Sequence, residues 1–513
     1  MPKSVFVVGI GGTGMRCIES FVHLCAIGMF DDTEVHLLAM DTDKDNGNFR
    51  RLAYLVDNYR KINGNAMKKH TLFSAKINYY QFSPDYDKSE SSSMSKIINN
   101  RYNNEEICSL GADSKIKASE LVNLLLRPEV VDMDLNHGYR AQTQMGSMLM
   151  YYAIIERAYQ DDYNKTTSGL RGFMNALNDG NSGHYVFVFG SVFGGTGASS
   201  LPIIPPAFNS AAKILSRNNC DVIEGNYYGS VILTNYFAFD SNVRTNDKVY
   251  ATSDKFALNS QAALNYYLKD QTVNDVYKRL YVLGREESLQ LNGPVVTGGA
   301  EQSNPADYIE LMAAFAAYDF FKTAPEDFKK DDLNKKFYCK GLPMGVDHLS
   351  FNNFTEDADE FRKRLGAMTV TAFLNSAYSY FENIRRDTIT FDEKLLEPLY
   401  NYFRTFGLYN DNGTIKSGWL EQIFNSAIQD NYQNGAFFMK PLFECQDGKR
   451  LKKYEINSKL FNMETPKSFK VGLFSSPFNV IKDNLKNYNV DNDNSLDALL
   501  ERTYHTIVSL YSL

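Results

Sequence analysis

Residues 185–198 read Tyr-Val-Phe-Val-Phe-Gly-Ser-Val-Phe-Gly-Gly-Thr-Gly-Ala, an apolar run that leads directly into a glycine-rich loop. The apolar run predicts a buried strand. Glycine lets the backbone approach phosphate oxygens closely, and a helix after the loop points free N–H groups and a partial positive charge at them. The threonine adds a hydroxyl donor. The stretch therefore predicts a phosphate-binding loop at the end of a strand.

A second stretch of the same kind lies about 180 residues earlier, where Ser4–Val8 leads into Gly9-Ile-Gly-Gly-Thr-Gly14. Two such loops in one domain suggest a nucleotide that is held from two sides. The chain has no G-x-x-x-x-G-K-[ST] motif, which argues against a P-loop NTPase.

The first loop also satisfies G-x-G-x-x-G, the dinucleotide fingerprint, through Gly9, Gly11 and Gly14. Asp41 closes the next expected strand and would bind a ribose hydroxyl in that interpretation. The separation of Gly14 from Asp41 exceeds the usual ~20 residues, and the second glycine loop stays unexplained. An NAD-dependent Rossmann enzyme is therefore the less favoured alternative.

Apolar strands alternate with helical patterns over the first 325 residues, which predicts a parallel, doubly wound α/β sheet with ligands at the carboxyl ends of its strands. The polar region at about 45–115 is predicted to be an insertion, helical in part. A helix is expected over Pro305–Thr323, with Asn304 as its N-cap. Beyond residue 330 the pattern changes, which predicts a second domain with a strand near 346–351, a helix over Ala358–Tyr380 and a last helix over Ser495–Leu513.

The bulk composition excludes several classes of protein. A net charge of −7 without a long basic run gives no footprint for nucleic acid. No stretch approaches the ~18 uninterrupted apolar residues of a membrane span. The six cysteines show no C-x-x-C pairing, so a cytoplasmic protein with reduced thiols is expected.

The second loop, Phe189–Ala198, resembles the G-G-G-T-G-[ST]-G signature of the tubulin/FtsZ family. Further resemblances follow in the family's order. Gly9–Gly14 is similar to the first phosphate loop, Asp41-Thr-Asp43 to the Asn-Thr-Asp segment, and Gly138–Gly146 to the loop that faces the terminal phosphate. Thr234–Arg244 is similar to the FtsZ run T-x-P-F-x-F-E-x-x-x-R, which implies ribose contacts for Asp240 and Arg244. Asp307 stands where the family places an Asn or Asp against the edge of guanine. A carboxylate there can accept hydrogen bonds from guanine N1–H and N2–H₂.

This resemblance implies a tubulin/FtsZ-like nucleotide-binding domain over 1–325 with a long central helix at 305–323, and a divergent α/β C-terminal domain over 326–513. It implies GTP or GDP with Mg²⁺, and GTP-dependent self-assembly into protofilaments with hydrolysis at subunit contacts. The residues implied at the nucleotide are Gly9, Gly11, Gly12, Thr13, Gly14, Asp41, Asp43, Ala141, Gln142, Gly190, Gly194, Gly195, Thr196, Gly197, Asp240, Arg244 and Asp307.

Departures from the family pattern qualify the resemblance. Phe193 replaces the first glycine of the signature and Ser199 its last. The acidic N-x-D-x-x-D loop that acts on the next subunit's nucleotide is absent, and Asp347 and Asp357 are the nearest candidate catalytic acids. The alternative is therefore a nucleotide-gated binding module that does not polymerise. The expected partners are further copies of the chain, and a second candidate partner is another protein that binds through the C-terminal domain.

Overall fold

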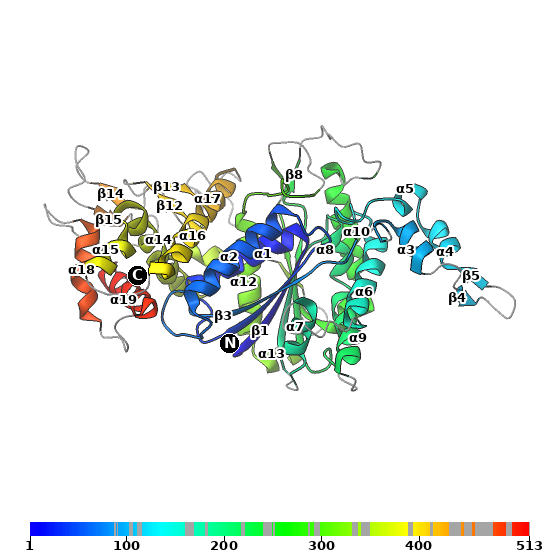
Figure 1. The fold of residues 1–513 in the computed structure, drawn as a ribbon, viewed down its shortest axis with the longest axis horizontal. Helices are drawn as coiled ribbons and strands as arrows, with labels where there is room; N and C mark the ends of the chain where they lie inside the picture. The colour runs from blue at the N-terminus through cyan, green and yellow to red at the C-terminus, as the bar shows by residue number, and fades with distance from the viewer. Residues whose placement is uncertain are drawn as a thin grey trace.

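A parallel sheet of seven strands forms the centre of the computed structural model (Figure 1). Its strand order is β11-β9-β7-β6-β1-β2-β3. The glycine loops follow β1 and β6, which are neighbours in the sheet, so their carboxyl ends lie side by side. The strands are β1 (Ser4–Ile10), β2 (Glu34–Met40), β3 (Lys76–Phe82), β6 (Tyr185–Ser191), β7 (Tyr227–Leu233), β9 (Tyr277–Leu283) and β11 (Phe337–Cys339).

The described residues are those placed well enough to support statements on structure. They are 1–86, 89, 91–101, 106–109, 115–159, 169–179, 183–216, 221–239, 249, 252–285, 288–291, 298–330, 337–339, 349–387, 393–410, 414–429, 443–445, 454–456, 476–488 and 495–511.

The sheet is buried on both faces, because successive residues of its apolar strands point to opposite sides. In β1, Val5 and Val7 contribute to one hydrophobic core, whereas Phe6 and Val8 contribute to the other. The first face is covered by α1 (Gly11–Ala26), α2 (Gly47–Asn63) and α12 (Tyr308–Lys322). The second is covered by α6 (Thr143–Tyr159), α7 (Gly169–Leu177) and α9 (Ile204–Ser216). The predicted α/β class with a parallel sheet is confirmed.

Helix α12 is almost wholly buried and lies between the sheet and the C-terminal part of the chain. It packs closely on β7, where a Cβ added to Gly229 would lie 2.7 Å from the ring of Phe320. The expected Asn304 cap is wrong: Asp307 is the N-cap and the helix begins at Tyr308. Three residues of the expected helix therefore belong to the connection before it.

The C-terminal part is mainly helical in its described residues and lies at one end of the molecule (Figure 1). Its helices are α14 (Ala358–Tyr378), α15 (Tyr380–Asp387), α16 (Leu396–Phe406), α17 (Trp419–Gln429), α18 (Pro477–Asn484) and α19 (Leu496–Tyr511). They share one hydrophobic core with α1, α2 and α12. Half of the expected strand at 346–351 lies outside the described residues; in the other half, Leu349 and Ser350 belong to no strand and Phe351 begins a 3₁₀ turn, Phe351–Asn353. The division at residue 325 stays a prediction.

The region expected as an insertion differs from that expectation in its first half. Helix α2 packs on α1, and β3 completes the main sheet beside β2. β3 reads as polar because it is an edge strand, with several half-buried side chains. The second half of the 45–115 region contains α3 (Met94–Arg101) and the small β4–β5 pair (Glu106–Ser109, Lys115–Lys117). Together with α4 (Ala118–Leu125) and α5 (Pro128–Val131), these elements lie at the end of the molecule opposite the C-terminal helices (Figure 1). Among the described residues, no helix is long and apolar enough to cross a membrane.

Candidate functional site

A pocket lies at the carboxyl ends of β1, β2 and β6 and holds about 990 Å³ of space, counting the part open to solvent. The loops after β1, β2 and β6 and the loop that precedes α6 all contribute to it, as do segments that follow β7 and precede α12. The expected site residues that line the pocket are Gly11, Gly12, Thr13, Asp41, Asp43, Ala141, Gly194, Gly195, Thr196 and Gly197.

The two glycine loops lie against each other. Gly11 has a φ of +69°, and a Cβ added there would lie 3.5 Å from Cβ of Thr196. Gly14 allows α1 to approach the sheet, since a Cβ there would lie 2.8 Å from the carbonyl oxygen of Phe189. The two loops therefore border the same space, with the Thr196 side chain packed against the bare backbone of Gly11.

The third loop contacts the second one directly. A Cβ on Gly195 would lie 2.7 Å from the backbone nitrogen of Ala141 and 2.8 Å from that of Arg140. Arg140 and Ala141 adopt positive φ angles of 45° and 63°. Left-handed backbone is unfavourable for side chains of this kind and is concentrated at functional sites. Gln142, the other expected γ-phosphate residue, does not line the pocket.

Phe193, the residue that departs from the family signature, belongs to an aromatic cluster beside the pocket. Its ring centroid lies 4.8 Å from that of Phe256 and 5.3 Å from that of Phe237. Asn259 Nδ2 donates to the Phe193 carbonyl at 3.1 Å. The aromatic cluster thus accommodates the ring that replaces glycine, and the pocket gains an apolar wall.

Two carboxyl groups that follow β2, those of Asp41 and Asp43, also line the pocket. Asp41 is buried, and burial raises its pKa to about 7 although backbone N–H groups favour the charged form. Asp43 Oδ2 accepts a hydrogen bond from the Gly299 N–H at 2.6 Å. This bond attaches the 298–304 segment to the edge of the pocket.

Further hydrogen bonds attach the 298–304 segment to the start of α2. Asn46 Nδ2 donates to Gln302 Oε1 at 2.5 Å, and Asn48 Nδ2 donates to the Gln302 carbonyl at 2.9 Å. The Asn304 N–H donates to Asn48 Oδ1 at 3.2 Å. The segment forms a wall of carboxamide side chains, and Asn46, Asn48, Gln302 and Asn304 all line the pocket.

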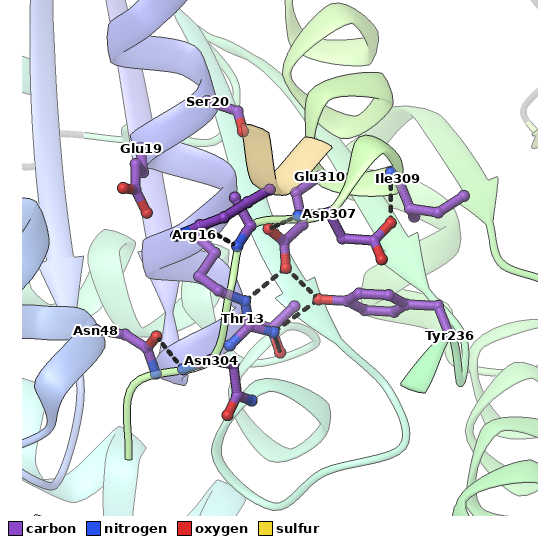
Figure 2. Close-up of polar contacts among 12 residues, drawn as sticks. Thr13, Arg16, Glu19, Ser20, Asn48, Tyr236, Asn304, Asp307, Ile309 and Glu310 are labelled. Atoms are coloured by element: carbon purple, nitrogen blue, oxygen red, sulfur yellow. Dashed lines mark hydrogen bonds and ion pairs between the residues drawn. The ribbon is translucent and has the colours of Figure 1, made fainter. Parts of the chain in front are cut away.

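A buried charged network (Figure 2) reaches the pocket through Arg16, which lines it. Arg16 Nε donates to Glu310 Oε1 at 2.5 Å, and its Nη2 donates to the Tyr236 hydroxyl at 2.7 Å. The Tyr236 hydroxyl donates in turn to Glu310 Oε1 at 2.6 Å. Burial opposes the charge on Arg16, but Glu310 and Tyr236 outweigh it and raise the pKa of Arg16. The guanidinium is therefore a fixed positive charge.

Asp307 does not line the pocket, contrary to the expectation that it faces the base. Its Oδ1 accepts from the Ile309 N–H at 2.9 Å, and Glu310 accepts from the Asp307 N–H, which together make a capping box. Its carboxylate pairs with Arg285 Nη2 at 3.0 Å. Burial raises the pKa of Asp307 to about 6, and Arg285 opposes this rise. The carboxyl group of Asp307 therefore caps the N-terminus of α12.

The other expected site residues lie elsewhere. Gly9, Gly14 and Gly190 support the loops from behind and do not line the pocket. Asp357, an expected catalytic acid, bonds to the Tyr318 hydroxyl at 2.7 Å and pairs with Lys322, in a separate cavity beside the C-terminal half of α12. Asp240, Arg244 and Asp347 lie outside the described residues.

The sequence analysis did not identify Arg16 or the carboxamide side chains as pocket residues. Arg16 carried one usable signal, because it is the first charged residue after the first glycine loop. Asn46, Gln302 and Asn304 carried none, since two distant segments bring them together.

Comparisons with known proteins add little to this geometry. No protein-family model matches the chain, and no curated protein matches it. Among solved structures, it is similar to the Clostridium botulinum phage c-st TubZ with its C-terminal tail truncated, at 12% identity and a TM-score of 0.20. The match covers 55% of this chain and 52% of that chain, so it spans about half of each. A superposition of this quality carries no argument about function.

Proposed function

We propose that this protein binds GTP, with Mg²⁺, in the pocket at the carboxyl ends of β1, β2 and β6. The observation that supports the proposal best is the convergence of two glycine loops and a third, left-handed loop on one space. Ligands of parallel α/β sheets bind at this edge.

The loops suit the phosphates. The N-terminus of α1 begins inside the first loop, at Gly11, so its free N–H groups and positive dipole end belong to the pocket wall. Thr13 and Thr196 add hydroxyl donors. Donors without intervening Cβ atoms are the arrangement that phosphate oxygens need.

Asp41 and Asp43 suit Mg²⁺, which binds proteins through one or two carboxylates and completes its shell with phosphate oxygens and water. A buried carboxyl group with a raised pKa lacks a compensating cation, and Mg²⁺ would supply that charge and neutralise the phosphates. Among the described residues, no group of three His, Cys, Asp or Glu could hold a metal unaided. We expect the ion to bind together with the phosphates, which complete its shell.

The proposal extends to GTP-dependent self-assembly, with hydrolysis at subunit contacts, as the sequence resemblance implies. Asp357 does not support the catalytic part, because Lys322 and Tyr318 engage its carboxylate within the same chain. The alternative is a module that binds the nucleotide without assembling.

Calorimetric titration with GTP, GDP, ATP and NAD in the presence of Mg²⁺ tests the binding step. We expect GTP to bind and EDTA to weaken it. Binding of NAD in preference to GTP would favour the dinucleotide enzyme, and absence of binding by any of the four would refute the proposal.

Light scattering of the purified protein after addition of GTP tests the assembly step, with GDP and ATP as controls. A GTP-specific rise that decays as GTP is consumed is the expected result. A rise that persists would indicate assembly without turnover. A flat trace from a protein that binds GTP would favour the non-assembling module.

A further inference from the structure

Arg16 combines near-complete burial with a place on the pocket wall. Its side chain is 2% exposed and lines the pocket one turn beyond Thr13. Nε bonds to Glu310, and Nη2 bonds to Tyr236 at 2.7 Å and more weakly to Thr13 Oγ1 at 3.4 Å. The remaining nitrogen, Nη1, has no hydrogen-bond partner among the described residues.

The partners of Arg16 hold the guanidinium in one orientation. Glu310 belongs to α12, Tyr236 follows β7 and Arg16 belongs to α1, so three separate elements define its position (Figure 2). The Phe237 ring, which also lines the pocket, lies 5.4 Å from the guanidinium carbon. A buried ion pair is a costly way to gain stability alone, since apolar residues of similar volume often serve as well. The free-energy cost of burying Arg16 and Glu310 is better explained if Arg16 is a fixed hydrogen-bond donor for a ligand in the pocket.

An arginine can only donate hydrogen bonds, so it selects acceptors on its ligand. Guanine presents two adjacent acceptors, O6 and N7, on one edge, whereas adenine replaces O6 with an amino group that donates. An arginine donating to O6 and N7 is a common way for proteins to recognise guanine.

We propose that Arg16 is the residue that selects guanine, by donating from Nη1 to O6 and N7 of the base. This inference rests on the proposed binding of GTP and replaces the base contact expected of Asp307. Asp307 is committed to the cap of α12 and to Arg285, and it does not line the pocket. The base is then read from its O6/N7 edge by a donor, and not from N1 and N2 by an acceptor.

Nucleotide analogues test this on the unmodified protein. 7-Deaza-GTP lacks the N7 acceptor, and ITP lacks the N2 amino group but keeps O6 and N7. We expect ITP to bind about as tightly as GTP, and 7-deaza-GTP to bind at least about tenfold more weakly, because a hydrogen bond to a charged donor is lost. A carboxylate reading N1 and N2 predicts the reverse order.

The outcomes separate this inference from the function on which it rests. If GTP binds and 7-deaza-GTP binds equally well, Arg16 does not read N7 and the inference is wrong while GTP binding stands. If no triphosphate binds, the proposed function itself is wrong. If ITP binds far more weakly than GTP, the base is read through its N2 edge and the inference is again wrong.

The Arg16→Lys variant provides the matched test of the residue. Lysine keeps a positive charge for Glu310, but its single nitrogen replaces the three of arginine, so no donor is left at the position of Nη1. We expect the GTP/ATP affinity ratio of this variant to fall by about 5- to 150-fold, the range for one specific arginine–guanine contact. Arg50→Lys, at an exposed arginine of α2 that pairs with Asp45, is the control and should keep the ratio. An unchanged ratio in a folded Arg16→Lys protein would overturn the inference, and the analogue series decides the matter if that variant does not fold.

Discussion

At the residue scale, the absence of a Cβ at Gly195 allows the second and third loops to pack directly against each other. The space that a Cβ would need is occupied by the backbone nitrogens of Arg140 and Ala141, which have no freedom to rotate away as a side chain would. Gly190, five residues earlier, differs, since a Cβ there would meet only ordinary contacts at 3.7 Å and it does not line the pocket.

The first prediction compares these two glycines. Gly195→Ala should displace the third loop, at a cost of about 1–3 kcal/mol as in other overpacked sites, and so weaken GTP binding about 5- to 150-fold. Gly190→Ala should bind GTP as the unmodified protein does. Titration of both variants checks this, and equal affinities would mean that contact between the loops is irrelevant to the ligand.

Asp41 supports a second prediction, on pH. In the unfolded chain its pKa is about 3.9, and in the folded protein it is raised to about 7. Between these values the folded state binds the proton more tightly, so the stability of the ligand-free protein falls as pH rises from about 4 to about 7. Asp41→Asn removes this loss, so the variant should gain on the unmodified protein by up to about 1.4 kcal/mol per pH unit in that window.

Thermal unfolding of the two ligand-free proteins from pH 4 to pH 8 measures this difference. Asp45→Asn, at a neighbouring exposed carboxylate, is the control, and only a pH dependence beyond that of this variant is assigned to Asp41. A pH dependence for Asp41→Asn no larger than that of Asp45→Asn would show that the Asp41 carboxyl group titrates normally.

At the element scale, the start of α12 is built by residues from several parts of the chain. Asp307 and Glu310 cap it from within. Helix α17 completes it from outside, because Gln422 Oε1 accepts from the Ala306 N–H at 2.8 Å and Ser426 Oγ accepts from the Tyr308 N–H at 3.1 Å. The first turn of the central helix therefore depends on the C-terminal part of the chain.

The third prediction separates capping from base recognition. Asp307→Asn keeps an oxygen for the cap but leaves the buried Arg285 without its carboxylate, which should lower the free energy of unfolding by about 3 kcal/mol. The preference for GTP over ATP should not change, because Asp307 does not line the pocket. Denaturant unfolding and titration measure the two effects. Asp359→Asn, with a 99% exposed carboxylate, is the stability control. Loss of the preference at unchanged stability would restore Asp307 as the base-reading residue.

Element-scale features also show what sequence could predict. The apolar strands and glycine loops were predictable, since both are local patterns that a short window contains. The true start of α12 was not, because Asn304 is as good a cap as Asp307 in isolation and distant Gln422 and Ser426 decide between them. The place of β3 in the sheet was not predictable either, because an edge strand lacks the continuous apolar run of its neighbours.

At the scale of the whole molecule, α17 contacts both α1, which lines the pocket, and α12, which begins a few residues after the pocket residue Asn304. Besides capping α12, it carries Trp419, whose indole N–H donates to Ser20 Oγ of α1 at 3.2 Å. Tyr402 of α16 adds a contact to the same helix, through a 2.8 Å hydrogen bond to His23. The helix that begins in the first glycine loop, α1, is thus attached at Ser20 and His23 to the C-terminal part.

The fourth prediction follows from these contacts. Binding of GTP should slow amide hydrogen exchange in α17 and in residues 299–308 by several-fold, because a ligand that fixes α1 and the start of α12 also fixes the helix bonded to both. Helix α19, which packs on α14 and does not line the pocket, is the internal control and should exchange at the same rate. Protection confined to the glycine loops would show that the pocket and α17 are uncoupled.

The position of β1 between β2 and β6 has a consequence for the order in which the chain becomes folded. β2 follows β1 closely, whereas Tyr185, the partner of Val5 on the other side, is synthesised about 180 residues later. Until then β1 is an open edge, and the first glycine loop has no second loop to face. Pairings across such a distance form slowly, because a long stretch of chain must be closed to make them. A ligand held by both glycine loops could therefore bind only after β1 and β6 have paired. The same pairing covers the open edge of β1, so a chain that binds this ligand no longer exposes that edge to other strands.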